Sequence, residues 1–124
     1  MSNEALTELN WDRLIRSLLN ATQKGEVQWE VIEPPIDVRR YAEGVVQAYK
    51  VPYLDRSFRI VPYKYKASND GEDFYWADGI SVEIVDSKDR VMYQVPGNTA
   101  GQRELLDAVR FQTANLDSLF SKLA

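Results

Sequence analysis

A helical pattern of apolar positions opens the chain. Its spacing alternates between three residues and one, so the apolar side chains share one face and predict an amphipathic helix. Asn10 is the expected N-cap, although Leu6 and Leu9 extend the apolar pattern upstream. Gly25 is the residue expected just beyond the C-terminus of this helix. The face is formed by Trp11, Leu14, Ile15, Leu18, Leu19 and Thr22.

Five segments then alternate between apolar and polar positions, as half-buried β-strands do. Only short turns separate most of them, which predicts antiparallel pairing of successive strands. Pro62 lacks an N–H group, so the third segment is expected to be an edge strand or to bulge there. Asp78 and Gly79 predict a turn-like interruption of the fourth. The expected strands cover residues 27–31, 45–51, 58–66, 74–85 and 91–95, with a loop or irregular edge at 36–44.

A second helical pattern closes the chain. Thr99 stands three residues before Gln102, the spacing of a capping box. Apolar side chains then recur at helical spacing from Leu105 to Leu123. Asn115 and Asp117 would cap a break that divides this region into two short helices.

The order of elements predicts a single α+β domain over residues 1–124. Its expected parts are an N-terminal helix, a meander-like antiparallel sheet of about five strands, and a C-terminal helix. Both helices have one apolar face and are expected to cover the same face of the sheet, with opposite faces as the alternative. A chain of 124 residues suits one domain rather than two.

The composition excludes several kinds of chemistry. The chain has no Cys and no His, which removes disulfides, thiolate catalysis, and the commonest general base and metal ligand. No phosphate-binding loop, dinucleotide fingerprint, nucleophile elbow or calcium loop is present. We therefore expect no cofactor, no metal and no enzymatic activity. Glu83 would be the carboxylate of interest if a second layer covered it, but a surface position is the expectation.

No apolar run approaches the length of a membrane span, and residues 1–4 lack the basic start of a signal peptide. The expected location is cytoplasmic, without a membrane partner.

Charge is unevenly distributed along the chain. Residues 36–66 contain seven basic and three acidic residues, whereas residues 67–89 contain seven acidic residues and one basic residue. This asymmetry predicts two surfaces of opposite charge.

Three consecutive aromatic residues, Phe74, Tyr75 and Trp76, cannot all face the core of a strand. Aromatic side chains are enriched at interaction hot spots, so an exposed Tyr75 or Trp76 beside Asp73 and Asp78 predicts a protein-binding patch. A covering loop is the alternative. The favoured function is a non-enzymatic interaction domain of the immunity, inhibitor or adaptor type, whose acidic face binds a basic partner.

A basic and aromatic surface gives the second hypothesis. Aromatic rings that stack on bases and cations that neutralise phosphates bind single-stranded nucleic acids. Alternation places Lys64 on the opposite face from the other candidates, and the chain is acidic overall, so this function is disfavoured. The candidate residues are Arg59, Tyr63, Lys64 and Tyr65.

Two further interpretations remain open. A polar cavity around Glu83 would indicate small-ligand binding in a cleft between the helices and the sheet. If Leu123 is not covered within the monomer, the apolar C-terminal stripe that it shares with Leu119 and Phe120 would be the interface of a homodimer.

Residues 18–29, Leu-Leu-Asn-Ala-Thr-Gln-Lys-Gly-Glu-Val-Gln-Trp, carry a resemblance. The segment resembles the start of short uncharacterised bacterial proteins, in which a helix ends in Ala-Thr or Lys-Thr, then Gly, then a Trp-bearing strand. Those proteins also tend to close with a helix after a sheet. The resemblance implies a bacterial accessory protein and supplies no catalytic residue.

Overall fold

The computed structural model describes residues 3–34, 47–68, 70–71 and 73–123. A long helix, α1 (Asn3–Gln23), precedes a five-stranded antiparallel sheet whose strands pair in chain order, and the helices α3 (Gln102–Thr113) and α4 (Leu116–Ser121) follow it. The predicted α+β class and meander are confirmed. The strands are β1 (Glu30–Ile32), β2 (Ala48–Tyr53), β3 (Arg56–Ala67), β4 (Tyr75–Val85) and β5 (Val91–Gln94).

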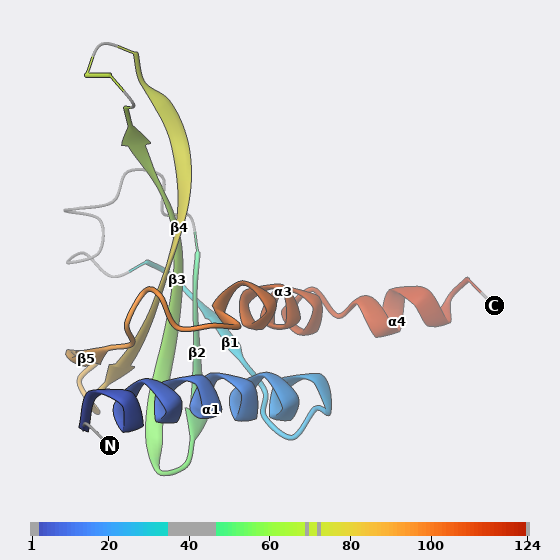
Figure 1. Cartoon of the computed structure of the whole chain (residues 1–124). Helices are drawn as coiled ribbons and strands as arrows, with labels where there is room; N and C mark the ends of the chain where they lie inside the picture. The colour runs from blue at the N-terminus through green and yellow to red at the C-terminus, as the bar shows by residue number, and fades with distance from the viewer. Residues whose placement is uncertain (1–2, 35–46, 69, 72, 124) are drawn as a thin grey trace.

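Helices α1 and α3 lie side by side across one face of the sheet (Figure 1). Their apolar stripes meet the alternate residues of the central strands, as the sequence predicts. This layer excludes water from most of the core, and its burial is the main favourable term in folding. Its fully buried residues are Ile15 and Leu18 of α1, Leu105, Leu106 and Val109 of α3, and Val51, Phe58, Ile60 and Val82 of the sheet.

The end of α1 follows the predicted glycine signal. Gly25 adopts a φ of 72°, and the N–H of Glu26 donates to the carbonyl of Ala21 at 2.9 Å. These are the features of a Schellman motif, which satisfies carbonyls left free at a helix end. The predicted N-cap is wrong, because the helix starts at Asn3 and Asn10 lies in its interior.

The predicted capping box of α3 is also wrong. Gly101, with a φ of 89°, occupies the N-cap and makes no side-chain cap bond. The Gln102 side chain donates instead to the carbonyl of Pro96 at 2.7 Å. A Cβ on Gly101 would lie 3.3 Å from the Ile15 side chain, so close packing against α1 accounts for a small residue here.

Three strand boundaries differ from the prediction. The first strand is shorter than residues 27–31 and begins at Glu30; Trp29 before it is buried, whereas Val31 is exposed. Strand β2 continues through Pro52 to Tyr53. Strand β4 passes through Asp78 and Gly79 without the predicted interruption. The predictions for residues 36–46 fall outside the described residues.

Gln112 joins three parts of the chain. Its side-chain amide nitrogen donates to the carbonyls of Val27 at 2.8 Å and Thr22 at 3.3 Å, and its amide oxygen accepts the N–H of Trp29 at 2.7 Å. The indole N–H of Trp29 in turn donates to the Thr22 hydroxyl at 2.9 Å. One residue of α3 therefore satisfies the backbone groups that lead from α1 into the sheet.

Helix α3 ends one residue after Gln112, at Thr113. Asn115 adopts a left-handed conformation with a φ of 55° and caps the separate helix α4. The sequence leaves open one C-terminal helix or two short ones, and the structure has two.

We predict that Gln112→Leu lowers the free energy of unfolding by about 2 kcal/mol, because it leaves the part-buried carbonyl of Val27 and N–H of Trp29 without their partner. Urea denaturation measures the change. Gln23→Leu, at an exposed position of α1, is the control and should change stability by less than about 0.5 kcal/mol. Equal effects of the two substitutions would contradict the role of Gln112.

Candidate functional site

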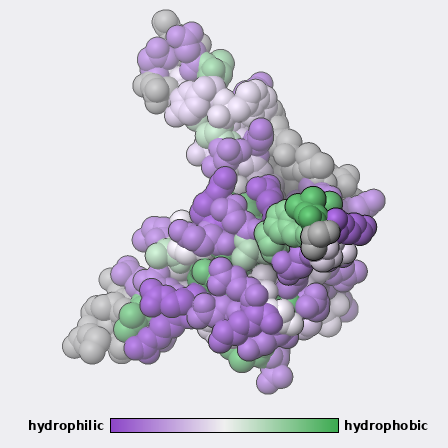
Figure 2. Space-filling view, turned by 90° about the vertical axis from the view of Figure 1, so that its right-hand side faces the viewer, coloured by the Kyte–Doolittle hydropathy of each residue, from purple (hydrophilic) through white to green (hydrophobic). Residues whose placement is uncertain are grey.

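A two-stranded arm projects from the sheet. β2 pairs with β3 only as far as Tyr49 opposite Ile60, and β5 reaches β4 only from Glu83 onward. Beyond those points β3 and β4 pair only with each other among the described strands, up to Ala67 opposite Tyr75. We call the described residues between 62 and 80 the arm. It extends past the layer of helices (Figure 1) and stands clear of the body in the space-filling view (Figure 2).

The start of the arm explains the position of Pro62. This residue lies two positions beyond Ile60, the last residue of β3 that pairs with β2, and it pairs with Ile80 in unbroken register. The predicted bulge is absent. A proline fits here because, among the described strands, none pairs with β3 on that side and requires the missing N–H.

The arm has two chemically different faces. In the register of β3 and β4, Tyr63 and Tyr65 lie on the face that Arg59 shares, and their rings are 5.9 Å apart. Lys66 and Trp76, directly opposite each other, lie on the other face, with the ammonium 5.6 Å from the indole. An exposed cation–π pair of this kind contributes about 0.5–1 kcal/mol.

Gly79 supports the tyrosine face. It lies opposite Tyr63, and a Cβ built on Gly79 would be only 2.3 Å from the Tyr63 Cζ. The ring therefore covers the bare backbone of β4, the packing by which an aromatic residue compensates a glycine in a strand. The glycine that predicts a turn in the sequence instead makes room for the ring of Tyr63 on the neighbouring strand.

Aromatic side chains on the arm are open to solvent. Phe74 is 71% exposed, Trp76 57%, Tyr75 49% and Tyr65 42%. Asp73 and Asp78 are also exposed, so all four predicted protein-interaction residues lie on the arm. At the tip the carboxylate of Asp70 accepts the N–H of Asp73 at 3.0 Å.

The nucleic-acid candidates do not form one surface. Arg59 is only 1% exposed and is held in an ion pair, which leaves it inaccessible to a phosphate. Tyr63 and Tyr65 lie on one face of the arm and Lys64 on the other, as the sequence predicts. Stacking and phosphate neutralisation would therefore have to come from opposite sides of a thin ribbon.

Glu83 is buried, contrary to the expectation of a surface acid. It lies directly opposite Arg59, and the Arg59 Nε donates to its Oε1 at 2.8 Å. A second guanidinium nitrogen is 3.5 Å from the carbonyl of Asp89. The third, Nη2, has no partner among the described residues. Burial makes the carboxylate dependent on this arginine, so the pair is structural rather than an acid–base site.

The acid-rich segment is not a single acidic face. The carboxylate of Asp86 accepts the N–H groups of Lys88 and Arg90, and the backbone N–H of Arg90 is the main cause that lowers the pKa of Asp86. Asp89 pairs with Lys50. β4 spans eleven residues, about 36 Å at the usual rise per residue, and separates these acids from those at the tip.

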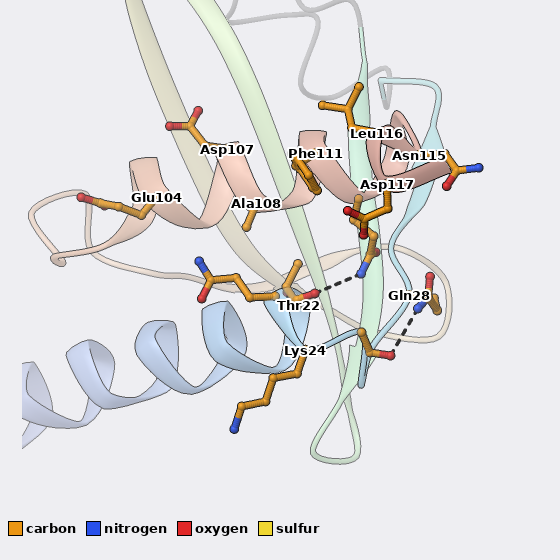
Figure 3. A pocket seen from close by; sticks show the side chains of 13 residues that line it. Thr22, Lys24, Gln28, Glu104, Asp107, Ala108, Phe111, Asn115, Leu116 and Asp117 are labelled. Atoms are coloured by element: carbon orange, nitrogen blue, oxygen red, sulfur yellow. Dashed lines mark hydrogen bonds between the residues drawn. The ribbon is translucent and has the colours of Figure 1, made fainter. Parts of the chain in front are cut away.

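A groove of about 840 Å³ lies between the end of α1 and the pair α3–α4 (Figure 3). Acidic side chains of Glu104, Asp107 and Asp117 line it beside Phe111 and Leu116. Helix α4 contributes no buried residue, and Figure 2 shows hydrophobic side chains gathered over it. The exposed apolar residues here are Phe111, Leu119, Phe120 and Leu123.

Comparison with known proteins identifies no relative: no family model, no curated protein and no solved structure matches the chain. Within the part of the chain that the structure describes, no cluster of acidic side chains is arranged to hold a metal ion. None of the described helices combines the length and apolar character needed to cross a membrane.

We predict that Arg59→Met destabilises the protein by about 3–5 kcal/mol, because it leaves Glu83 buried without its partner. The double variant Arg59→Met/Glu83→Leu should recover most of that loss. Arg90→Met breaks an exposed pair with Asp86 and should cost about 1 kcal/mol or less. Thermal and urea unfolding measure all three. An Arg59→Met protein as stable as the Arg90 control would contradict the structural role.

We predict that Gly79→Ala displaces the Tyr63 ring and destabilises the arm by about 1–3 kcal/mol, as overpacking does. The NMR signals of the Tyr63 ring and amide exchange along β4 should report the change. Gly97→Ala is the control, because no atom lies within 4 Å of a Cβ at that position. Unchanged Tyr63 signals in Gly79→Ala would contradict the packing.

Proposed function

We propose that this chain is a non-enzymatic protein-interaction domain that binds another protein through the aromatic residues of the arm. The observation that carries the proposal is the exposure of Tyr65, Phe74, Tyr75 and Trp76 on a ribbon that extends beyond both layers of the fold. Tyrosine and tryptophan supply most of the binding free energy at many interfaces. Four aromatic side chains that face solvent bury little apolar surface within the fold, and a cluster of this kind often marks an interaction site.

The support comes from placement as well as exposure. Antiparallel pairing with β4 extends β3 directly from the buried core, so Tyr65, Tyr75 and Trp76 are presented by regular strands, and Phe74 immediately precedes β4. A pre-ordered surface loses little conformational entropy when it binds. Asp73 and Asp78 flank Tyr75 and Trp76 and would add polar contacts at the rim.

The chemistry of the partner differs from the expectation of an extended acidic face. Glu83, Asp86 and Asp89 are engaged in pairs within the domain. The exposed acids beside the aromatic residues of the arm, which a basic partner would meet, are Asp73 and Asp78. Immunity, inhibitor and adaptor proteins all act by binding other proteins. The bacterial, cytoplasmic setting stays a prediction. A homodimer through α4 also stays a prediction, supported by the exposure of Leu119, Phe120 and Leu123.

A site-specific photo-crosslinker tests the proposal in host cells. Placed at Tyr75 or Trp76, it should yield a discrete adduct with another protein, which mass spectrometry identifies. Placed at Tyr93, an exposed aromatic residue of β5, it should not. With the purified partner, Trp76→Ala should weaken binding by about 2 kcal/mol, roughly 30-fold, because the residue would be a hot spot.

Circular dichroism controls for folding, since Trp76 is exposed and its removal should lower the melting temperature by no more than a few degrees, the contribution of its cation–π pair with Lys66. Adducts at Tyr93 alone, or equal affinity of the wild type and Trp76→Ala for the partner, would overturn the proposal. The nucleic-acid alternative would require binding to single strands that weakens as salt rises.

A further inference from the structure

A pocket lies where the arm leaves the body, between β3, β4 and α3. Its volume is about 390 Å³, within the range of small-molecule sites. Tyr49 and Leu106, both buried in the core, contribute to its lining. Apart from Gln47, the residues that line the pocket belong to strands of the sheet and to α3.

Positive charge converges on this pocket. Lys64 comes from β3, and Arg103 and Arg110 come from α3. Asp78 is the one acidic residue in the lining, so the lining carries a net charge of +2 in a chain whose net charge is −4. Such a local excess attracts an anion to a protein that repels anions elsewhere.

The cations are not used by the fold. Neither Lys64 nor Arg110 forms an ion pair with any residue that the structure describes. Arg103 is 3.8 Å from Asp107, and both side chains are more than 60% exposed, so this contact is weak. Three cationic groups around one pocket repel each other, and a bound anion would remove that repulsion.

The spacing of the cations suits more than one anionic group. Arg103 and Arg110 lie seven residues apart on α3, about 10 Å along the helix axis, on the same side after two turns. Lys64 reaches the pocket from the strand opposite. Arginine binds carboxylate and phosphate oxygens in a bidentate manner, whereas lysine adds a point charge.

We propose that this pocket binds a polyanion through carboxylate or phosphate groups, with Arg103, Arg110 and Lys64 as the ligand-binding residues. Tyr49 and Gln47 form its polar floor, where the tyrosine hydroxyl donates to the Gln47 amide oxygen at 3.2 Å. The ligand is a small di- or tricarboxylate, a pyrophosphate-like molecule, or a short acidic stretch of a bound chain. The proposal does not depend on the aromatic residues of the arm.

Calorimetry and amide NMR of the full chain at low salt test this site with three probes: citrate, inorganic pyrophosphate, and a six-residue peptide of alternating Asp and Glu. At least one probe should bind saturably, with amide shifts centred on residues 64, 78, 103 and 110. Arg110→Gln and Lys64→Gln should each weaken that binding at least about tenfold, because each removes a charge-assisted contact.

Arg56→Gln is the matched control: it removes the same charge from an exposed position at the opposite end of β3 and should change binding less than about twofold. Binding of citrate or pyrophosphate would identify a free small anion as the ligand, and binding of the peptide alone would identify an acidic segment. No saturable binding by any probe, or equal weakening by Arg56→Gln, would overturn the proposal. Trp76→Ala should leave the anion affinity unchanged, which separates this site from the interaction proposed for the arm.

Discussion

The antiparallel pairing of β3 with β4 is the interaction on which the rest of the structure depends. It runs without a break in register from Ser57 opposite Val85 to Ala67 opposite Tyr75. One end lies under α1 and α3 and supplies Phe58, Ile60 and Val82 to the core, and the other end is the arm. Because the same two strands form both parts, the core fixes the direction and twist of the arm. A ribbon of two strands alone would be only marginally stable.

Much of this architecture follows from periodicity that a single sequence displays. Alternating residues predict the strands, and the apolar stripes predict both helices and the face that they cover, because burial selects one face of each element. Gly25 and Asn115 are recognisable since their positive φ angles are costly for most residues. The exposure of Tyr75 and Trp76 also follows from pattern, as three consecutive aromatic residues cannot all reach a core on one side.

The features that could not be predicted from the sequence depend on contacts with residues distant along the chain. The sequence predicts that Glu83 is a surface acid, but the register places Arg59, 24 residues earlier, directly opposite it. Gly79 suggests a turn until Tyr63 is known to cover it. The side chain of Gln102 satisfies a distant carbonyl rather than capping its own helix. In each case local propensity yields to a tertiary contact, and register sets that contact.

The register of the strands also decides which charged side chains pair within the fold and which remain exposed to a binding partner. The acid-rich segment of the sequence becomes a strand whose acids are distributed along its length, and Glu83, Asp86 and Asp89 pair with Arg59, Arg90 and Lys50. The exposed charges that remain include Asp73 near the tip of the arm and the cations Lys64, Arg103 and Arg110 at its base. A ligand that spans the arm therefore meets acids near the tip, aromatic rings along the ribbon and cations beside α3. Opposite charges at the two ends favour one orientation of an extended partner over its reverse, since the reversed orientation places like charges together.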